Sequence, residues 1–270
     1  MTDGHGDGAV VSPKQERGAR VVTEVSVPGA PPRVEHPEWR EAMPWLAQGT
    51  TARWPDGTAY DMGLFGATPV RDAMARWAGL RAATGCPRAV HSRQVHGAAI
   101  APHERTGPGL FVGDGHDGHV TSTTGLLLTV SIADCVPAFL VDPRRRAVAL
   151  VHAGWRGVAR GVLESGIAAL AEGGSQPAVL LLHLGPAICG ECYEVGAEVF
   201  EALGEAAPAA TAPIDLRGVL ATRALAAGLG EAGITVSAHC TRCGRRGPRR
   251  FHSHRAGDPE RQIAYLGLRA

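Results

Sequence analysis

Short, densely apolar runs separated by turn residues make up much of the chain after residue 85. Nearly every position in these runs is apolar, instead of every second one, which is typical of strands covered on both faces of a sheet. Strands are predicted at 88–91, 126–132, 138–141, 147–151, 178–184, 234–238 and 263–268.

Other segments repeat apolar residues at the spacing of one helix face. Helices are predicted at 71–84, 157–171, 193–204 and 215–229. Strands and helices do not alternate strictly, because residues 126–151 contain two or three consecutive strands. This order favours an α+β domain, with mixed sheet covered by helices, over a doubly wound parallel sheet.

The chain is predicted to form one domain preceded by an N-terminal extension. Residues 1–35 are rich in Gly, Pro and polar residues, which is typical of a flexible arm. Between residues 36 and 270 no linker, repeat or low-complexity block divides the sequence. We therefore expect a single domain over 36–270.

The composition is that of an ordinary soluble globular protein, with 44% hydrophobic residues, 20% charged residues and a net charge of +1. This balance predicts neither a nucleic-acid partner nor binding to an anionic membrane surface. No apolar run approaches the roughly 20 residues of a membrane helix, and residues 1–35 lack the apolar region of a secretory signal. We therefore expect a cytoplasmic protein whose six cysteines are free thiols or metal ligands.

Three reactive side chains, His96, Cys135 and His152, follow strand-like runs. Cysteine and histidine serve equally well as zinc ligands or as a nucleophile–base pair. As zinc ligands, two histidines and one cysteine leave the fourth position open, which is the arrangement of catalytic zinc sites. As a hydrolase site, Cys135 is the nucleophile, His152 the base, and Asp134 or another acid orients the histidine. Spacing alone leaves open whether the three side chains converge.

A glycine-rich turn, "HAGWRG" (152–157), leads from a predicted strand into the helix predicted at 157–171. Free backbone N–H groups at a helix start favour an anion, and Arg156 could add a bidentate contact to phosphate or carboxylate. Arg156 and Gly157 are therefore candidate anion-binding residues. A buried Arg–carboxylate pair would explain Arg156 equally well.

Two C-x-x-C pairs, Cys189/Cys192 and Cys240/Cys243, are separated by 47 residues. Such pairs form four-thiolate structural zinc sites, although zinc ribbons usually separate them by roughly 15–20 residues. A zinc-stapled binding module is thus a non-enzymatic alternative. After the second pair, His252 and His254 would point to one face of a strand and could line a pocket, or they could be solvated.

Six motifs occur in an order and spacing that resemble one protein family. They are "RQVHG" (93–97), "DGHVT" (117–121), "IADCVPAFLVDP" (132–143), "VHAGWRG" (151–157), "GPAICGECYEVGAEV" (185–199) and the C-terminal set "CTRC", "RFHSHRAG" and "RQIAYL". From about residue 45 onward the chain resembles the laccase-domain, or multicopper polyphenol oxidase, family. Members of this family are described as purine nucleoside phosphorylases with adenosine deaminase side activity.

The resemblance implies a single α+β domain and a zinc ion held by His96, Cys135 and His152. It also implies phosphorolysis of a purine nucleoside such as adenosine or inosine, so the expected partners are a small nucleoside and phosphate, with the oligomeric state open. Tyr193 matches the family's C-Y-E-V motif and Arg255 its F-S-Y-R-R motif, which makes both candidates for substrate binding.

Departures from the family pattern leave the substrate open. Residues 50–66 lack the glycine pair of the family's early motif, and Cys189 with Glu191 alters its Gly-Pro-Cys turn. Two enzymatic alternatives are a Cys–His amidohydrolase of the peptidoglycan-editing type and a copper-dependent polyphenol oxidase. Copper is less favoured than zinc. Multicopper centres need several H-x-H pairs, and the chain has one. Blue copper needs an axial Met beside a set of two histidines and one cysteine (His₂Cys), and the chain has four methionines in all.

Overall fold

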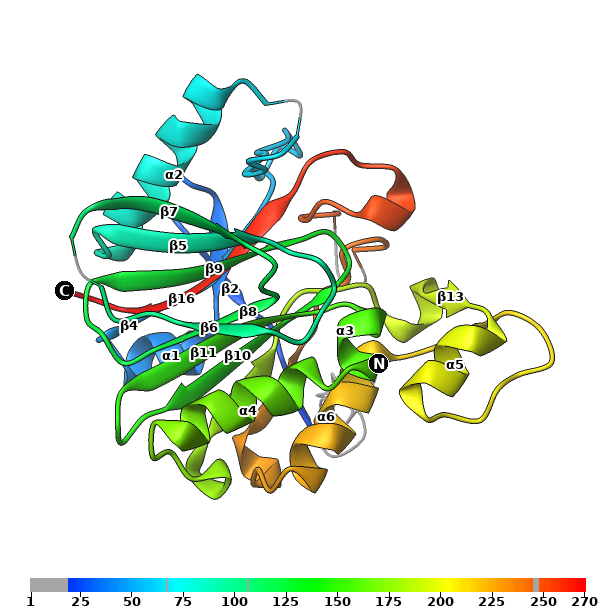
Figure 1. Cartoon of the computed structure of the whole chain (residues 1–270). Coiled ribbons are helices and arrows are strands. Elements are labelled where there is room, and N and C mark those ends of the chain that lie inside the picture. Colours follow the sequence, from blue (N-terminus) through cyan, green and yellow to red (C-terminus); the bar gives the residue numbers. More distant parts are fainter. Residues whose placement is uncertain (1–18, 67, 106, 245–247) are drawn as a thin grey trace, which may run out of the picture.

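Two seven-stranded sheets lie face to face at the centre of the computed structural model (Figure 1). The structure describes residues 19–66, 68–105, 107–244 and 248–270. The first sheet contains, in spatial order, β1 (Arg20–Val22), β15 (Ile234–Ser237), β12 (Leu181–Leu184), β10 (Val136–Asp142), β11 (Ala147–Ala153), β8 (Gly118–Thr121) and β6 (Ile100–Pro102). The second contains β2 (Val25–Val27), β3 (Arg33–Glu35), β4 (Leu46–Thr51), β16 (Gln262–Leu268), β9 (Leu126–Ile132), β5 (Arg88–Arg93) and β7 (Gly109–Asp114).

Helices cover the outer face of each sheet (Figure 1). α2 (Val70–Thr84) packs on the second sheet, and α4 (Val162–Glu172) and α6 (Leu216–Ala226) pack on the first. The remaining helical elements are α1 (Pro37–Ala42), α3 (Trp155–Ala159), α5 (Ala197–Leu203), η1 (Pro177–Val179), η2 (Gly190–Cys192), η3 (Glu231–Gly233) and η4 (His254–Ala256). A small pair, β13 (Glu194–Val195) and β14 (Ala212–Pro213), stands apart from the two large sheets.

Side chains of the central strands alternate between two different cores. Leu126 and Leu128 of β9 pack between the sheets, whereas Leu127 packs under α2. In β10, Phe139 points between the sheets and Leu140 points to the helix-covered face. Both faces of these central strands are therefore buried, which is why their segments are continuously apolar. The prediction of an α+β domain with mixed sheet covered by helices is confirmed.

The predicted and observed bounds of helices and strands agree most closely where the apolar pattern is strongest. The strand predicted at 126–132 coincides with β9, and the helix predicted at 71–84 differs from α2 by one residue. The helix predicted at 157–171 is interrupted, because Gly161 has a φ of 78° and separates α3 from α4. The helix predicted at 193–204 begins only at α5, since the preceding β13 pairs with β14.

The predicted flexible arm is wrong for residues 20–35. β1 pairs in parallel with β15, and β2 and β3 extend the second sheet. Glu24, which lies between β1 and β2, is 4% exposed and accepts hydrogen bonds from His183 (3.0 Å) and Ser237 (2.9 Å). The two acids of this segment, Glu24 and Glu35, are buried with polar or charged partners, a pairing that composition does not reveal. Residues 1–18 of the predicted arm lie outside the described residues.

In the part of the chain that the structure describes, no helix is both long and apolar enough to cross a membrane.

Candidate metal centre

Two loops and the end of β11 bring His96, Cys135 and His152 together at one edge of the two sheets. His96 follows β5, Cys135 lies between β9 and β10, and His152 is the penultimate residue of β11. Their ligand atoms all lie within 4.8 Å of one another. The Cys135 Sγ is 3.9 Å from the His96 Nε2, and the two imidazole rings meet edge to face with centroids 4.9 Å apart. The structure thus brings together the three residues at the ends of separate strands.

Asp117, just before β8, positions two of these residues. Its fully buried carboxylate accepts the Nδ1 hydrogen of His152 at 2.9 Å. It also accepts the backbone N–H groups of Val95 (3.1 Å), His96 (2.9 Å) and Gly97 (2.7 Å). The hydrogen bond to Nδ1 leaves Nε2 of His152 to face the Cys135 sulfur. Sequence reasoning missed this role, although Asp117 is the first residue of the family motif "DGHVT", whose other residues form β8 beside β11.

The buried charges of this site depend on one another. Burial alone would raise the pKa of Cys135, but the positive charge of His152 and hydrogen bonds from both histidines lower it to about 6. Burial alone would lower the pKa of His152, but the Cys135 thiolate and the bond to Asp117 raise it to about 9. Without a metal, the pair is therefore a thiolate and an imidazolium near neutral pH. A thiolate is both the metal-binding and the nucleophilic form of cysteine.

Two glycines allow the close approach of these loops. A Cβ on Gly154 would lie 2.7 Å from the His96 Cδ2 and 3.0 Å from the Cys135 Sγ, so a side chain there would occupy the space between the ligands. A Cβ on Gly157 would lie 2.9 Å from the carbonyl oxygen of Gly97, where α3 packs on the loop that carries His96.

The expectation that Gly157 opens a helix is wrong, whereas its anion-binding role stays a prediction. α3 begins at Trp155 with Gly154 as its N-cap, so Gly157 is the third residue of a five-residue helix. Its close contact with the neighbouring loop explains why glycine occupies this position. Arg156 is exposed, and its guanidinium lies over the Trp155 ring, 4.3 Å from the centroid.

Asp134 does not orient His152, which corrects its predicted catalytic role. Its carboxylate accepts a hydrogen bond from the Thr241 hydroxyl and another from the backbone N–H of Arg255, at 2.7 Å. Its backbone has a φ of 93°, immediately before Cys135. Asp134 therefore ties two later loops to the turn that carries Cys135, while Asp117 is the acid that contacts the histidine.

Tyr193 lies within electrostatic range of the other candidate substrate-binding residues. Burial, together with the negative charge of the Cys135 thiolate, raises the pKa of Tyr193 to about 12, although Arg255 and Arg156 oppose the rise. The Arg255 guanidinium lies 5.4 Å from the centroid of the Tyr193 ring and donates a hydrogen bond to the carbonyl of Glu194 at 3.1 Å. The exposed guanidinium groups of Arg156 and Arg255 and the half-buried Tyr193 phenol thus lie close to the metal-ligand candidates. His96, Cys135 and His152 are called the His₂Cys group below.

The two histidines of the H-x-H pair do not share a face. His252 is fully buried and its Nδ1 lies 3.6 Å from a Glu260 carboxylate oxygen, whereas His254 is exposed at the start of η4. Because this segment turns into a 3₁₀ helix instead of continuing as a strand, the expected alternation fails.

Comparison with known proteins relates the chain to one family. The profile of the family described as multi-copper polyphenol oxidoreductase laccase matches residues 68–269. The chain is 34% identical over 171 residues to adenosine deaminase RL5 from an unknown prokaryotic organism, covering 57% of this chain and 65% of that protein. It is 40% identical over 130 residues to purine nucleoside phosphorylase SCO2081 of Streptomyces coelicolor, covering 46% of this chain and 51% of that protein. The chain thus spans between half and two thirds of these two relatives.

A solved structure shares the whole fold. YlmD from Geobacillus stearothermophilus superposes with a TM-score of 0.80 at 27% sequence identity, covering 92% of this chain and 100% of that chain. The face-to-face sheets and their covering helices are therefore an arrangement that this chain shares with an experimentally determined protein.

Proposed function

We propose that this protein carries out metal-dependent chemistry on purine nucleosides. The premise is that the chain belongs to the laccase-domain family, which is described as multi-copper polyphenol oxidoreductase laccase. Relatives in the family carry the names purine nucleoside phosphorylase and adenosine deaminase. The proposed reaction is phosphorolysis of adenosine or inosine, with deamination of adenosine as a side activity. The observation that carries the proposal is the convergence of His96, Cys135 and His152 at one edge of the sheets.

The donor set fits a zinc ion. Zinc is held in proteins by imidazole nitrogen and thiolate sulfur, and catalytic sites use three protein ligands with one position open. His152 donates its Nδ1 hydrogen to a buried carboxylate, as metal-binding histidines commonly do, and Gly154 keeps side-chain atoms out of the space between the ligands. When bound, zinc supplies a Lewis acid for a substrate oxygen or for water.

The surrounding residues supply the anion site that phosphorolysis requires. Arg156 and Arg255 are exposed guanidinium groups near Tyr193, and arginine binds phosphate through paired N–H donors. Phosphate positioned there would form a bond from one oxygen to the ribose anomeric carbon. The bond to the purine nitrogen breaks, and the base leaves with that electron pair and the proton that hydrogen phosphate brings.

The test is product release from inosine or adenosine with and without phosphate. Hypoxanthine or adenine should appear together with ribose 1-phosphate only when phosphate is present. His96→Ala should abolish this release, whereas His103→Ala should retain it, because His103 pairs with His119 outside the His₂Cys group. Equal release of base without phosphate would refute phosphorolysis.

A cysteine hydrolase is the second candidate, favoured by the charge state of the site. Cys135, His152 and Asp117 are arranged as nucleophile, base and orienting acid, with the pKa of Cys135 lowered to about 6. The expected substrate class is an amide, as in the peptidoglycan-editing role. Amide hydrolysis that survives chelation, together with a covalent adduct on Cys135, would favour this function; activity lost on chelation and regained with zinc would exclude it.

Copper-dependent oxidation of phenols is the activity that the family's description names. A blue copper centre adds a long axial methionine bond to a His₂Cys set. Met43 packs between the two sheets and Met62 packs with Trp77 under α2. Met74 is exposed on α2, so the placement of the methionines that the structure describes favours zinc over copper at the His₂Cys group.

A further inference from the structure

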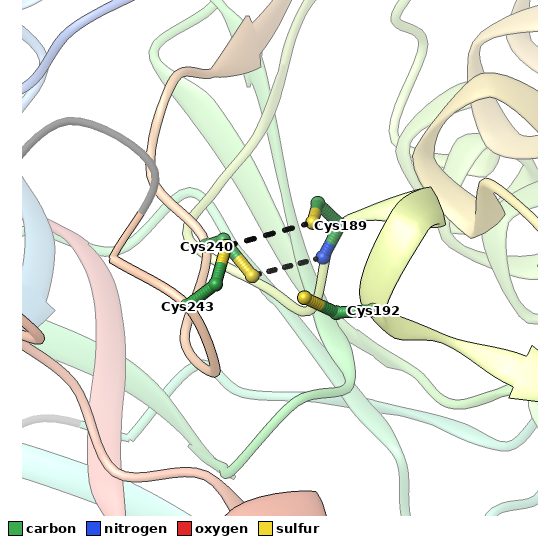
Figure 2. Close-up of side chains that lie close together, drawn as sticks. All are labelled: Cys189, Cys192, Cys240 and Cys243. Atoms are coloured by element: carbon green, nitrogen blue, oxygen red, sulfur yellow. Dashed lines mark hydrogen bonds between the residues drawn. The ribbon is translucent and has the colours of Figure 1, made fainter.

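The two C-x-x-C pairs, which the proposed function does not use, meet beside the candidate metal centre. β12 and β15 are neighbouring parallel strands, so the segments that follow them leave the sheet at the same edge. Cys189 and Cys192 follow β12, and Cys240 and Cys243 follow β15. A β-bridge between Ala187 and Cys240 holds the two segments together, and Figure 2 shows the four side chains directed toward one another.

The spacing of the four sulfur atoms is that of a tetrahedral metal site. All four Sγ atoms lie within 4.8 Å of one another, and the Sγ atoms of Cys189 and Cys243 are 3.9 Å apart. Zn–S bonds of about 2.3 Å give a tetrahedron with edges of about 3.8 Å. A disulfide would require a sulfur–sulfur distance of about 2.05 Å. The group is therefore arranged as four mutual neighbours instead of as two bonded pairs.

Backbone hydrogen bonds hold each pair in a turn, and several backbone N–H groups are directed at the Cys240 sulfur. The N–H of Cys192 bonds to the carbonyl of Cys189 at 3.0 Å, and the N–H of Gly244 bonds to the carbonyl of Cys240 at 3.2 Å. The backbone N–H of Cys189 donates to the Cys240 sulfur at 3.3 Å (Figure 2), and those of Cys243 and Arg242 also interact with this sulfur. N–H donors directed at sulfur favour the deprotonated form, which is the form that binds metal.

Burial of the group suits a structural ion at the edge of the protein. Cys189 and Cys240 are buried at 0% and 1% exposure, Cys192 is partly exposed and Cys243 is exposed. Ionised thiolates gathered this closely repel one another unless a cation lies between them. One open side gives the ion a route of entry, and four protein ligands close the coordination shell.

We propose that Cys189, Cys192, Cys240 and Cys243 bind a structural zinc ion, separate from the ion proposed at the His₂Cys group. The ion joins the turn after β12 to the turn after β15. Both turns carry residues of the candidate centre: Tyr193 directly follows one ligand, and Thr241, directly after another, donates to Asp134 beside Cys135. The tetrathiolate ion therefore has a positioning role for the loops around the reactive centre.

Metal analysis of the purified full-length chain tests the proposal. The wild-type protein, produced with zinc, should contain two zinc ions per chain, one for each group. Cys243→Ser should lower the content to one, and so should His96→Ala, while combining the two changes should remove both ions. Cys86→Ala is the matched control for loss of a thiol, since Cys86 packs under α2, and it should retain both.

A second pair of variants separates loss of metal from failure to fold. Cys192→Ser should lose the ion, whereas Cys192→His should retain it, because histidine is also a zinc ligand. Cobalt substitution of the His96→Ala chain should give thiolate charge-transfer absorption that weakens in Cys243→Ser.

Three outcomes would overturn the proposal. They are one zinc per chain that Cys243→Ser does not change, the four cysteines recovered as disulfides, and iron in place of zinc in the isolated protein. Loss of zinc from Cys192→His to the same extent as from Cys192→Ser would also count against it.

Discussion

Replacing Asp117 by Asn tests how much of the candidate centre depends on one buried carboxylate. The wild-type oxygens accept hydrogen bonds from the His152 ring and from three consecutive backbone N–H groups, at 2.7–3.1 Å. Asn has nearly the same shape but replaces one acceptor oxygen by an NH₂ donor, which then faces donors. The change therefore alters hydrogen bonding at the site while leaving its volume almost unchanged.

The expected cost follows from the number of partners lost. Leaving a buried donor unsatisfied costs about 1–3 kcal/mol of folding free energy. Because the carboxylate orients His152 and positions the backbone of His96, zinc affinity should fall about 10- to 100-fold, as for other residues that hold metal ligands. Both effects should appear together, because the same oxygens support the fold of the loop and the orientation of the ring.

Two measurements on purified protein give these quantities. Urea denaturation of the metal-free chain gives the change in folding free energy, and competition with a chromogenic chelator gives the zinc dissociation constant. Asp114→Asn is the matched control, since Asp114 pairs with Arg93 where the two side chains are 66% and 65% exposed. Surface pairs of this kind contribute little, so neither quantity should change. If Asp117→Asn bound zinc as tightly as Asp114→Asn, the assigned role of Asp117 would be wrong.

Three further changes test other parts of the site and fold. Gly154→Ala should lower kcat/KM about 100-fold, because the added methyl group would displace His96 and Cys135. Gly79→Ala is the control, since a Cβ there has no atom within 4 Å, and it should leave kcat/KM unchanged. Equal activity of the two variants would refute the close approach of Gly154 to His96 and Cys135. In metal-free protein, iodoacetamide labelling of Cys135 should be half-maximal near pH 6, because only the thiolate reacts. Cys86, whose pKa burial raises to about 11, should stay unlabelled at neutral pH. Half-maximal labelling of Cys135 near pH 9 would contradict the thiolate–imidazolium pair. Glu24→Ala should cost about 1–3 kcal/mol in urea denaturation, because it leaves the buried hydrogen-bond donors of His183 and Ser237 without an acceptor; no change would restore the flexible-arm interpretation.

Strands with two buried faces are the part of the fold that the sequence predicts best. Leu127 and Leu128 face different cores, so no polar residue interrupts the run, and the limits of β9 can be located from apolarity alone. β3 has the opposite character, because Arg33 and Glu35 form an ion pair that is more than nine-tenths buried. In a sequence, charged residues of this kind are typical of a solvated loop, and only the structure shows that the two are paired and buried.

For the candidate centre, residue type and strand position identify ligands better than they identify supporting residues. His96, Cys135 and His152 each follow or end an apolar run, so a common edge could be anticipated. Asp117 and Asp134 are both acids near strand ends, and nothing local distinguishes the one that contacts His152. The distinction depends on sheet order: β8 lies beside β11, which brings Asp117 next to the end of the strand that carries the histidine.

The two C-x-x-C pairs show why sequence separation must be judged against the connection that fills it. A spacing of roughly 15–20 residues describes zinc ribbons, in which short hairpins present the pairs. Parallel strands instead require a crossover of a dozen or more residues, usually containing a helix, and α5 and α6 lie between β12 and β15. The 47 intervening residues are thus the length of a crossover, after which neighbouring parallel strands return both pairs to one edge. A long separation between two such pairs is evidence against a ribbon, and it is compatible with a four-thiolate site whenever the intervening segment has the pattern of helices between parallel strands.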